Sequence, residues 1–243
     1  MSTLTDHQSV INRPVVCNTG DMTAFHRARS EEQRAVRRAA ILDAAATMLD
    51  EVGVAALSLN ELARQVGLAK SNVLRYFDSR EAILLELLDA RTAEWLAALE
   101  ATTRPRGSVP NRCRRLAASL TDSLVERPVL CDLISAQAAV LERNVSVDVA
   151  LRHKRAALGN IRRLTTLVRS AVPELAEPQA VKFAAATLLT SGALWTHHQP
   201  SEAMLAAYRA DPELAILRID FSAALRELLT VLLTGLLDPS CQN

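Results

Sequence analysis

The 243-residue sequence predicts an all-α fold of about nine helices, and two observations support this prediction. First, hydrophobic residues make up 49% of the chain, while good helix formers dominate and only seven glycines occur. Second, apolar residues recur at spacings of three and four along most of the chain, which is the period of a half-buried helix. This much apolar sequence suits one or two domains with a buried core.

The charge balance excludes a simple electrostatic DNA binder. The net charge is +1, and residues 1–100 hold eleven Lys and Arg against fourteen Asp and Glu. A non-specific architectural protein needs a net basic surface, so any DNA contact must depend on where the cations lie. Residues 1–30 are polar and aperiodic and predict a flexible extension without a signal peptide.

The cysteines and the hydropathy pattern indicate a cytoplasmic protein. Cys17, Cys113, Cys131 and Cys241 are too scattered for a paired metal or redox motif, so we expect reduced thiols. No apolar run approaches the ~18–20 residues of a membrane span. We expect no membrane partner.

The first predicted helix runs from Glu31 for about 20 residues and ends at Gly53. Its apolar face comprises Val36, Ala40, Ile41, Ala44, Ala45, Met48, Leu49 and Val52. Ser58 then starts a second, short helix, where Glu61 completes a capping box, and Gly67 ends it. Residues 70–77 form a third short helix, and Asp78 begins a fourth that reaches about Thr102.

Two short helices joined by a tight turn at Gly67 are typical of a helix-turn-helix. In such a unit, Asn72 can pair with adenine and Arg75 with guanine, whereas Lys70 and Tyr76 suit phosphates. Taken singly, each of these residues also fits an ordinary solvated position. The arginines near the start of the first helix, including Arg27 and Arg29, fit either a DNA-binding arm or a charged helix face. The predicted DNA-contacting residues are Arg34, Arg37, Arg38, Ser58, Lys70, Ser71, Asn72, Leu74, Arg75, Tyr76 and Arg80.

Residues 34–84 resemble the DNA-binding region of the tetracycline-repressor family. The resemblance is most specific from Gly67 to Phe77 and into the following Asp-Ser-Arg-Glu-Ala. It implies that Tyr76 contacts a phosphate, Phe77 lies in the core and Lys70 lies near the DNA backbone. The family usually has Ser or Thr where Ala69 stands, and often Thr and Tyr in place of Asn72 and Leu74. These departures predict an operator sequence of its own.

The best internal boundary is residues 103–110, which hold two prolines and a glycine. Beyond it we expect helices at about 110–126, 129–143, 146–170, 178–198 and 212–236, with a short one at 201–209. The predicted organisation is an extension at 1–30, a helix-turn-helix domain at 31–80 and a helical regulatory and dimerisation domain at 81–243.

The last two long helices are strongly apolar, so their own core or a partner must bury them. The family resemblance implies that they pair with their copies as a homodimer, which suits a palindromic operator. Residues 149–173 are basic without an acidic residue. They fit a second nucleic-acid surface, a solvated stripe, or arginines that contact acidic residues elsewhere.

An effector pocket among the middle helices is a further implication of the resemblance. Core packing explains its apolar members equally well, whereas a buried Gln137 needs a partner. The candidates are Leu120, Leu124, Leu133, Ile134, Gln137, Leu141, Leu158, Ile161, Phe183 and Trp195. The adjacent His197 and His198 diverge by ~100° on a helix and have no further ligands at metal spacing. We expect no metal and no cofactor.

These features predict a sequence-specific regulator that binds double-stranded DNA. The family resemblance implies a repressor that binds as a dimer and is released by a small apolar effector. The alternative within this fold is control by a protein partner, or no control at all. An enzyme is the alternative of another class, but the sequence has no Gly-rich phosphate loop, HExxH, GxSxG or CxxC.

Overall fold

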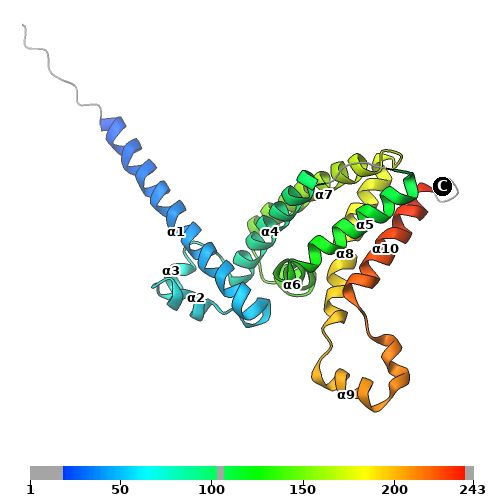
Figure 1. The fold of residues 1–243 in the computed structure, drawn as a ribbon. Helices are drawn as coiled ribbons and strands as arrows, with labels where there is room; N and C mark the ends of the chain where they lie inside the picture. The colour runs from blue at the N-terminus through cyan, green and yellow to red at the C-terminus, as the bar shows by residue number, and fades with distance from the viewer. Residues whose placement is uncertain (1–18, 103–106, 239–243) are drawn as a thin grey trace, which may run out of the picture. The chain divides into compact units, whose positions relative to one another are not determined.

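The computed structural model describes residues 19–102 and 107–238, with the side chains of 31–101 and 107–238. Every regular element in these ranges is helical, which confirms the all-α prediction (Figure 1). Among the described residues, none of the helices combines the length and the hydropathy of a membrane span. The elements are α1 (Thr19–Ala56), α2 (Leu59–Gln65), α3 (Lys70–Val73), α4 (Arg80–Thr102), α5 (Val109–Val125), α6 (Pro128–Ala136), the π-helix η1 (Gln137–Leu141), α7 (Val147–Ala171), α8 (Glu177–His198), α9 (Glu202–Ala210), the 3₁₀-helix η2 (Pro212–Leu217) and α10 (Phe221–Leu237).

The chain divides into two compact units, residues 1–39 and 40–243, which we describe separately. Helix α1 begins at Thr19, before the expected start at Glu31. Residues 1–18 of the expected extension lie outside the described part. Near the other end of α1, Gly53 has a φ of 73°, a left-handed conformation that glycine adopts without strain and that ends the regular helix as expected.

A small core joins α2 to α3. Leu62 and Ala63 on α2 and Val73 on α3 are buried. Gly67 turns the chain between the two helices with a φ of +65°. Helix α3 is shorter than the expected 70–77, because the backbone tightens into turns after Val73: the Tyr76 amide donates to the Val73 carbonyl at 2.9 Å. The helix-turn-helix is therefore present, with a compact second helix.

The start of α4 differs from the prediction by two residues. Ser79 is the cap, since its hydroxyl accepts from the Ala82 amide at 3.1 Å, and α4 begins at Arg80. Asp78, the expected first residue, instead accepts a hydrogen bond from the Ser146 hydroxyl at 2.6 Å. Ser146 also caps α7. One residue pair thus joins the end of the helix-turn-helix to the start of α7.

Helices α4 to α8 and α10 pack around one apolar core. Helix α10 packs against α5 and α8, α6 packs against α8, and α7 packs against both α4 and α8 (Figure 1). Cys113 and Cys131 are buried free thiols in this core, and burial raises the pKa of the Cys131 thiol to about 12. Cys17 and Cys241 lie outside the described residues.

Two expected helices are interrupted in the structure. The segment 129–143 is α6 followed by the π turn η1, and 212–236 is η2 followed by α10. The second break has a local cause in the sequence. Asp211 caps η2 by accepting from the Glu213 amide at 3.0 Å, and Asp220 caps α10 by accepting from the Ala223 amide at 2.7 Å. Two capping aspartates start two helices where periodicity predicted one.

Candidate nucleic-acid interface

Helix α3 presents a polar face on a buried anchor. Val73 and, just after the helix, Phe77 are buried in the core, as expected for Phe77. The side chains between and before them face outward: Lys70, Ser71, Asn72, Leu74 and Arg75 are exposed, and Tyr76 is half-buried. The structure therefore brings together on one short surface the residues that sequence analysis assigned to base and phosphate contacts.

The start of α3 lacks a side-chain cap. Ala69 holds the N-cap position with extended backbone (φ −69°, ψ 147°) and offers no hydrogen bond to the first amides. Lys70 follows at once and forms no ion pair with any described residue. Open amides and a free ammonium group at a helix start favour an anionic partner such as a phosphate.

Helix α2 has the predicted cap but only half of the predicted capping box. The Ser58 hydroxyl accepts from the Glu61 amide at 3.2 Å. The Glu61 carboxylate does not complete the box and instead accepts from the Arg64 guanidinium. This hydrogen bond lowers the pKa of Glu61. The prediction for Glu61 is wrong because an arginine one turn away offers a charged donor.

Arg80 is not placed to contact DNA, and its prediction is corrected. Its side chain is mostly buried, and its Nε donates to the Leu57 carbonyl at 2.5 Å. Its terminal nitrogen donates to the Val54 carbonyl. Arg80 therefore holds the chain that leaves α1, where carbonyl groups would otherwise lack partners. An outward-facing arginine and this inward one look alike in sequence.

The three arginines of the expected arm lie on α1 within the first compact unit. Arg34 and Arg37 are exposed and Arg38 is half-buried. They extend along a helix rather than a loose tail. The side chains of Arg27 and Arg29 lie outside the described set.

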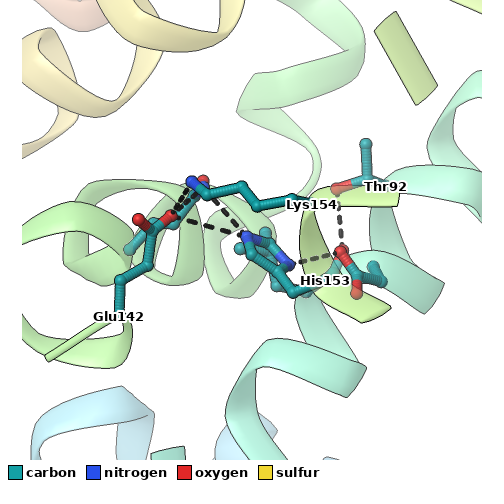
Figure 2. Close-up of polar contacts among 7 residues, drawn as sticks. Thr92, Glu142, His153 and Lys154 are labelled. Atoms are coloured by element: carbon teal, nitrogen blue, oxygen red, sulfur yellow. Dashed lines mark hydrogen bonds and ion pairs between the residues drawn. The ribbon is translucent and has the colours of Figure 1, made fainter. Parts of the chain in front are cut away.

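A buried polar network near the middle of the chain was missed by sequence analysis (Figure 2). His153 on α7 is 3% exposed and its Nδ1 lies 2.8 Å from the Asp89 carboxylate on α4. On the other side of the ring, the Gln137 amide lies 3.1 Å from Nε2 and also donates to Glu142 at 2.7 Å. Lys154 donates to the same Glu142 oxygen at 2.7 Å. Gln137, which is half-buried, thus has the polar partners that were expected for it.

The network joins α4 and α7 to the π turn η1, which begins at Gln137. Burial alone would raise the pKa of Glu142, but the hydrogen bonds from Lys154 and Gln137 outweigh it and lower the pKa. Only Gln137 was singled out from sequence, because Asp89 and His153 are 64 residues apart and no spacing rule joins them.

The other candidate pocket residues belong mainly to the packed core. Leu120, Leu124, Leu133 and Phe183 are fully buried, as is Leu141, and Trp195 is nearly so. The Trp195 indole donates to Asp132 at 2.6 Å. Ile134 and Ile161 are half-buried. Leu158 is 47% exposed and does not belong with an interior pocket, which corrects that assignment.

Three of the six Lys and Arg residues of 149–173 pair with acidic residues. Arg163 forms a two-pronged pair with Glu100, its Nη2 lying 3.0 Å from the carboxylate. Lys154 pairs with Glu142, and Arg169 lies 3.7 Å from Glu177. These pairs support the interpretation in which arginines of this segment contact acidic residues elsewhere in the chain.

Comparison with known families agrees with the fold. Residues 41–87 match the family described as bacterial regulatory proteins, tetR family. Residues 89–240 match the tetracyclin repressor-like C-terminal domain. Together the two matches cover most of the chain, including α2, α3 and every later element. The chain belongs to the TetR family of transcriptional regulators.

Solved structures show the same fold at low sequence identity. The fatty acid degradation regulator FadR from Bacillus halodurans is 16% identical with a TM-score of 0.50, over 82% of this chain and 95% of that one. FadR from Bacillus subtilis, solved with stearoyl-CoA, is 15% identical with a TM-score of 0.50, over 80% and 97%. A TetR regulator from Rhodococcus sp. RHA1 is 14% identical with a TM-score of 0.50, over 84% and 97%. No curated protein matches the sequence.

Proposed function

We propose that this TetR-family chain binds a palindromic operator as a homodimer and reads it through α3. The observation that carries the proposal is the outward face of α3, where Asn72 and Arg75 stand exposed above the buried Val73. Asn and Arg are the side chains that pair bidentately with adenine and guanine in the major groove. Lys70 and Tyr76 flank them as phosphate contacts.

The test separates base reading from charge. We expect Asn72→Ala and Arg75→Ala each to cost about 1–3 kcal/mol on the selected operator and little on unrelated DNA. Lys70→Ala should weaken binding to both DNAs alike and reduce the salt dependence. Arg64→Ala is the matched control, because Arg64 is exposed on α2 but already paired with Glu61. An equal loss on all sequences from Asn72→Ala would remove its base-reading role.

The arm on α1 is tested by salt titration. Arg34, Arg37 and Arg38 fit phosphate contacts, so we replace all three with Gln. The slope of log K against log salt should then fall by about 0.9 for each phosphate that the protein no longer neutralises. An unchanged slope would mean that the three arginines do not neutralise phosphates and form only a charged helix face.

We further propose repression released by a small apolar effector, with nine of the candidate pocket residues as its site. The family resemblance supports this part, and stearoyl-CoA is a first probe because FadR from Bacillus subtilis was solved with it. The expected result is weaker operator binding and a higher melting temperature in its presence.

The packing of Leu120, Leu124, Leu133 and Phe183 in the core favours the alternative, a regulator of this fold controlled by a partner or by nothing. If no compound in a broad metabolite panel changes operator affinity, the alternative replaces the effector.

A further inference from the structure

A cavity outside the proposed effector site lies where α8 ends and α10 begins. Its volume is about 360 Å³, within the range of small-molecule sites. Its walls come from four segments: the last turn of α8, α9, η2 and the link to α10. The lining residues are His197, His198, Pro200, Tyr208, Ala215, Arg218, Ile219 and Asp220.

Three polar side chains of the lining have no partner of their own. His197, Tyr208 and Arg218 form no side-chain hydrogen bond or ion pair with any described residue. The other two polar groups are engaged: the His198 Nδ1 lies 3.3 Å from the Ile219 carbonyl, and Asp220 caps α10. The cavity therefore presents an imidazole, a phenol and a guanidinium group that are available to a ligand.

We propose that this cavity binds a small monocarboxylate. Arg218 provides the forked guanidinium that pairs with a carboxylate through two parallel hydrogen bonds. Tyr208 and His197 supply further donors, while Pro200, Ala215 and Ile219 form an apolar wall for the body of the ligand. The one acid of the lining, Asp220, has its charge directed to the positive end of α10.

The cavity has elements without buried residues on one side and packed aromatic rings on the other. Helix α9 and η2 contain no buried residue, so their positions depend little on the core. By contrast, His198 lies 5.7 Å from Trp195 and 6.2 Å from Phe221, measured between ring centroids. Trp195 and Phe221 meet edge to face at 4.9 Å. A ligand that contacts His198 therefore lies close to Trp195, whose fluorescence can report binding.

The experiment titrates the full-length protein with benzoate, benzamide and benzylamine, which share a ring and differ in charge. Tryptophan fluorescence and calorimetry report binding. We expect saturable binding of benzoate alone, because benzamide and benzylamine lack the carboxylate that pairs with the Arg218 guanidinium.

Variants locate the site. Arg218→Gln should weaken benzoate binding about tenfold or more, as expected when one charge-assisted pair is removed. His197→Gln should weaken it less, because it alters one polar group of the lining and leaves the guanidinium in place. Arg209→Gln is the matched control, since Arg209 is an exposed arginine of α9 outside the lining. Equal binding of the three probes, or equal effects of Arg218→Gln and Arg209→Gln, would overturn the proposal.

Any effect of the carboxylate on operator binding rests on the function proposed above and is measured separately on DNA. The two parts can therefore fail independently. Benzoate binding without an effect on DNA keeps the site and removes its regulatory role, and operator binding by Arg218→Gln without benzoate binding leaves the DNA function intact.

Discussion

Arg80 shows how one side chain in this protein can be assigned the wrong role from sequence alone. Its guanidinium donates to the Val54 and Leu57 carbonyls, whose residues are buried, and lies 3.4 Å from Glu81. Replacing it leaves buried acceptors without donors, which costs more than the bonds themselves contribute. Arg80 is therefore a structural arginine beside the proposed DNA-binding surface.

We expect Arg80→Met to lower the free energy of unfolding by about 2–3 kcal/mol, measured by urea titration. Arg80→Lys should recover only part of the lost free energy of unfolding, because one ammonium group does not match two separated carbonyls. The matched control is Arg64→Met, an exposed arginine that should leave unfolding unchanged. If Arg80→Met is as stable as wild type yet binds DNA poorly, Arg80 is a DNA contact after all.

The lowered pKa of Glu142 predicts how the free energy of unfolding depends on pH. Its pKa in the folded protein is lowered, despite burial, by the hydrogen bonds from Lys154 and Gln137. A carboxyl whose folded pKa is depressed stabilises the fold above its unfolded pKa, and this contribution is lost as the pH falls through the folded value. Glu142→Gln should therefore destabilise the protein near neutral pH by about 1–3 kcal/mol.

The difference between wild type and Glu142→Gln should shrink as urea titrations are repeated down to about pH 3.5, below the usual carboxyl range. Glu126→Gln is the control: that carboxylate is exposed and lies 3.8 Å from Arg127. If the difference in free energy of unfolding between wild type and Glu142→Gln stays constant with pH, the charge of Glu142 does not contribute to stability.

At the scale of helices, α6 and α8 meet at a glycine. A Cβ built on Gly192 would lie 3.1 Å from the Ile134 side chain and 3.3 Å from the Ile134 carbonyl and the Ser135 Cα. Two of these neighbours are backbone atoms, which cannot move aside without shifting α6. The close approach of the two helices therefore depends on the missing side chain.

Gly192→Ala should lower the free energy of unfolding by about 1–3 kcal/mol, the usual cost of overpacking. Gly159→Ala is the opposite case on α7, since nothing lies within 4 Å of its built Cβ. There alanine should stabilise the protein by about 0.5–1 kcal/mol through better helix propensity. Thermal melts of the two variants should move in opposite directions, and melts that move together would contradict the packing argument.

Local signals predicted most of the elements. Gly53, Gly67 and Ser58 mark helix ends through backbone freedom and capping, which depend on a few neighbouring residues. The break between η2 and α10 was not predicted, because the apolar pattern continues across it. Asp220 nevertheless caps a new helix there. Capping competes with periodicity there, and the cap decides where the helix begins.

Long-range contacts explain the errors at the candidate site. Lys70, Asn72 and Arg75 were predicted to face outward because their position in a helix-turn-helix sets their direction. The direction of Arg80 depends on carbonyls 23 and 26 residues earlier. The pairing of His153 with Asp89 spans 64 residues. Such pairs are fixed by the packed fold, which no local rule contains.

For the whole molecule, the proposed dimer accounts for apolar side chains that its own core leaves uncovered. Leu189 on α8 is 75% exposed, and Val181 on α8 and Val231 on α10 are also exposed. These helices pack against each other and are the two that the family resemblance assigns to dimerisation. Burying such side chains against a second copy removes apolar surface from water.

Leu189→Glu should therefore shift the protein from dimer to monomer in sedimentation at micromolar concentration, because a charge buried in an apolar interface lacks a partner. Val147→Glu is matched in exposure, since Val147 is also 75% exposed, but it lies at the start of α7. That variant should remain dimeric. Operator affinity should fall with the dimer, since two linked recognition helices bind two half-sites together. A dimeric Leu189→Glu, or a monomeric wild type, would exclude this face as the interface.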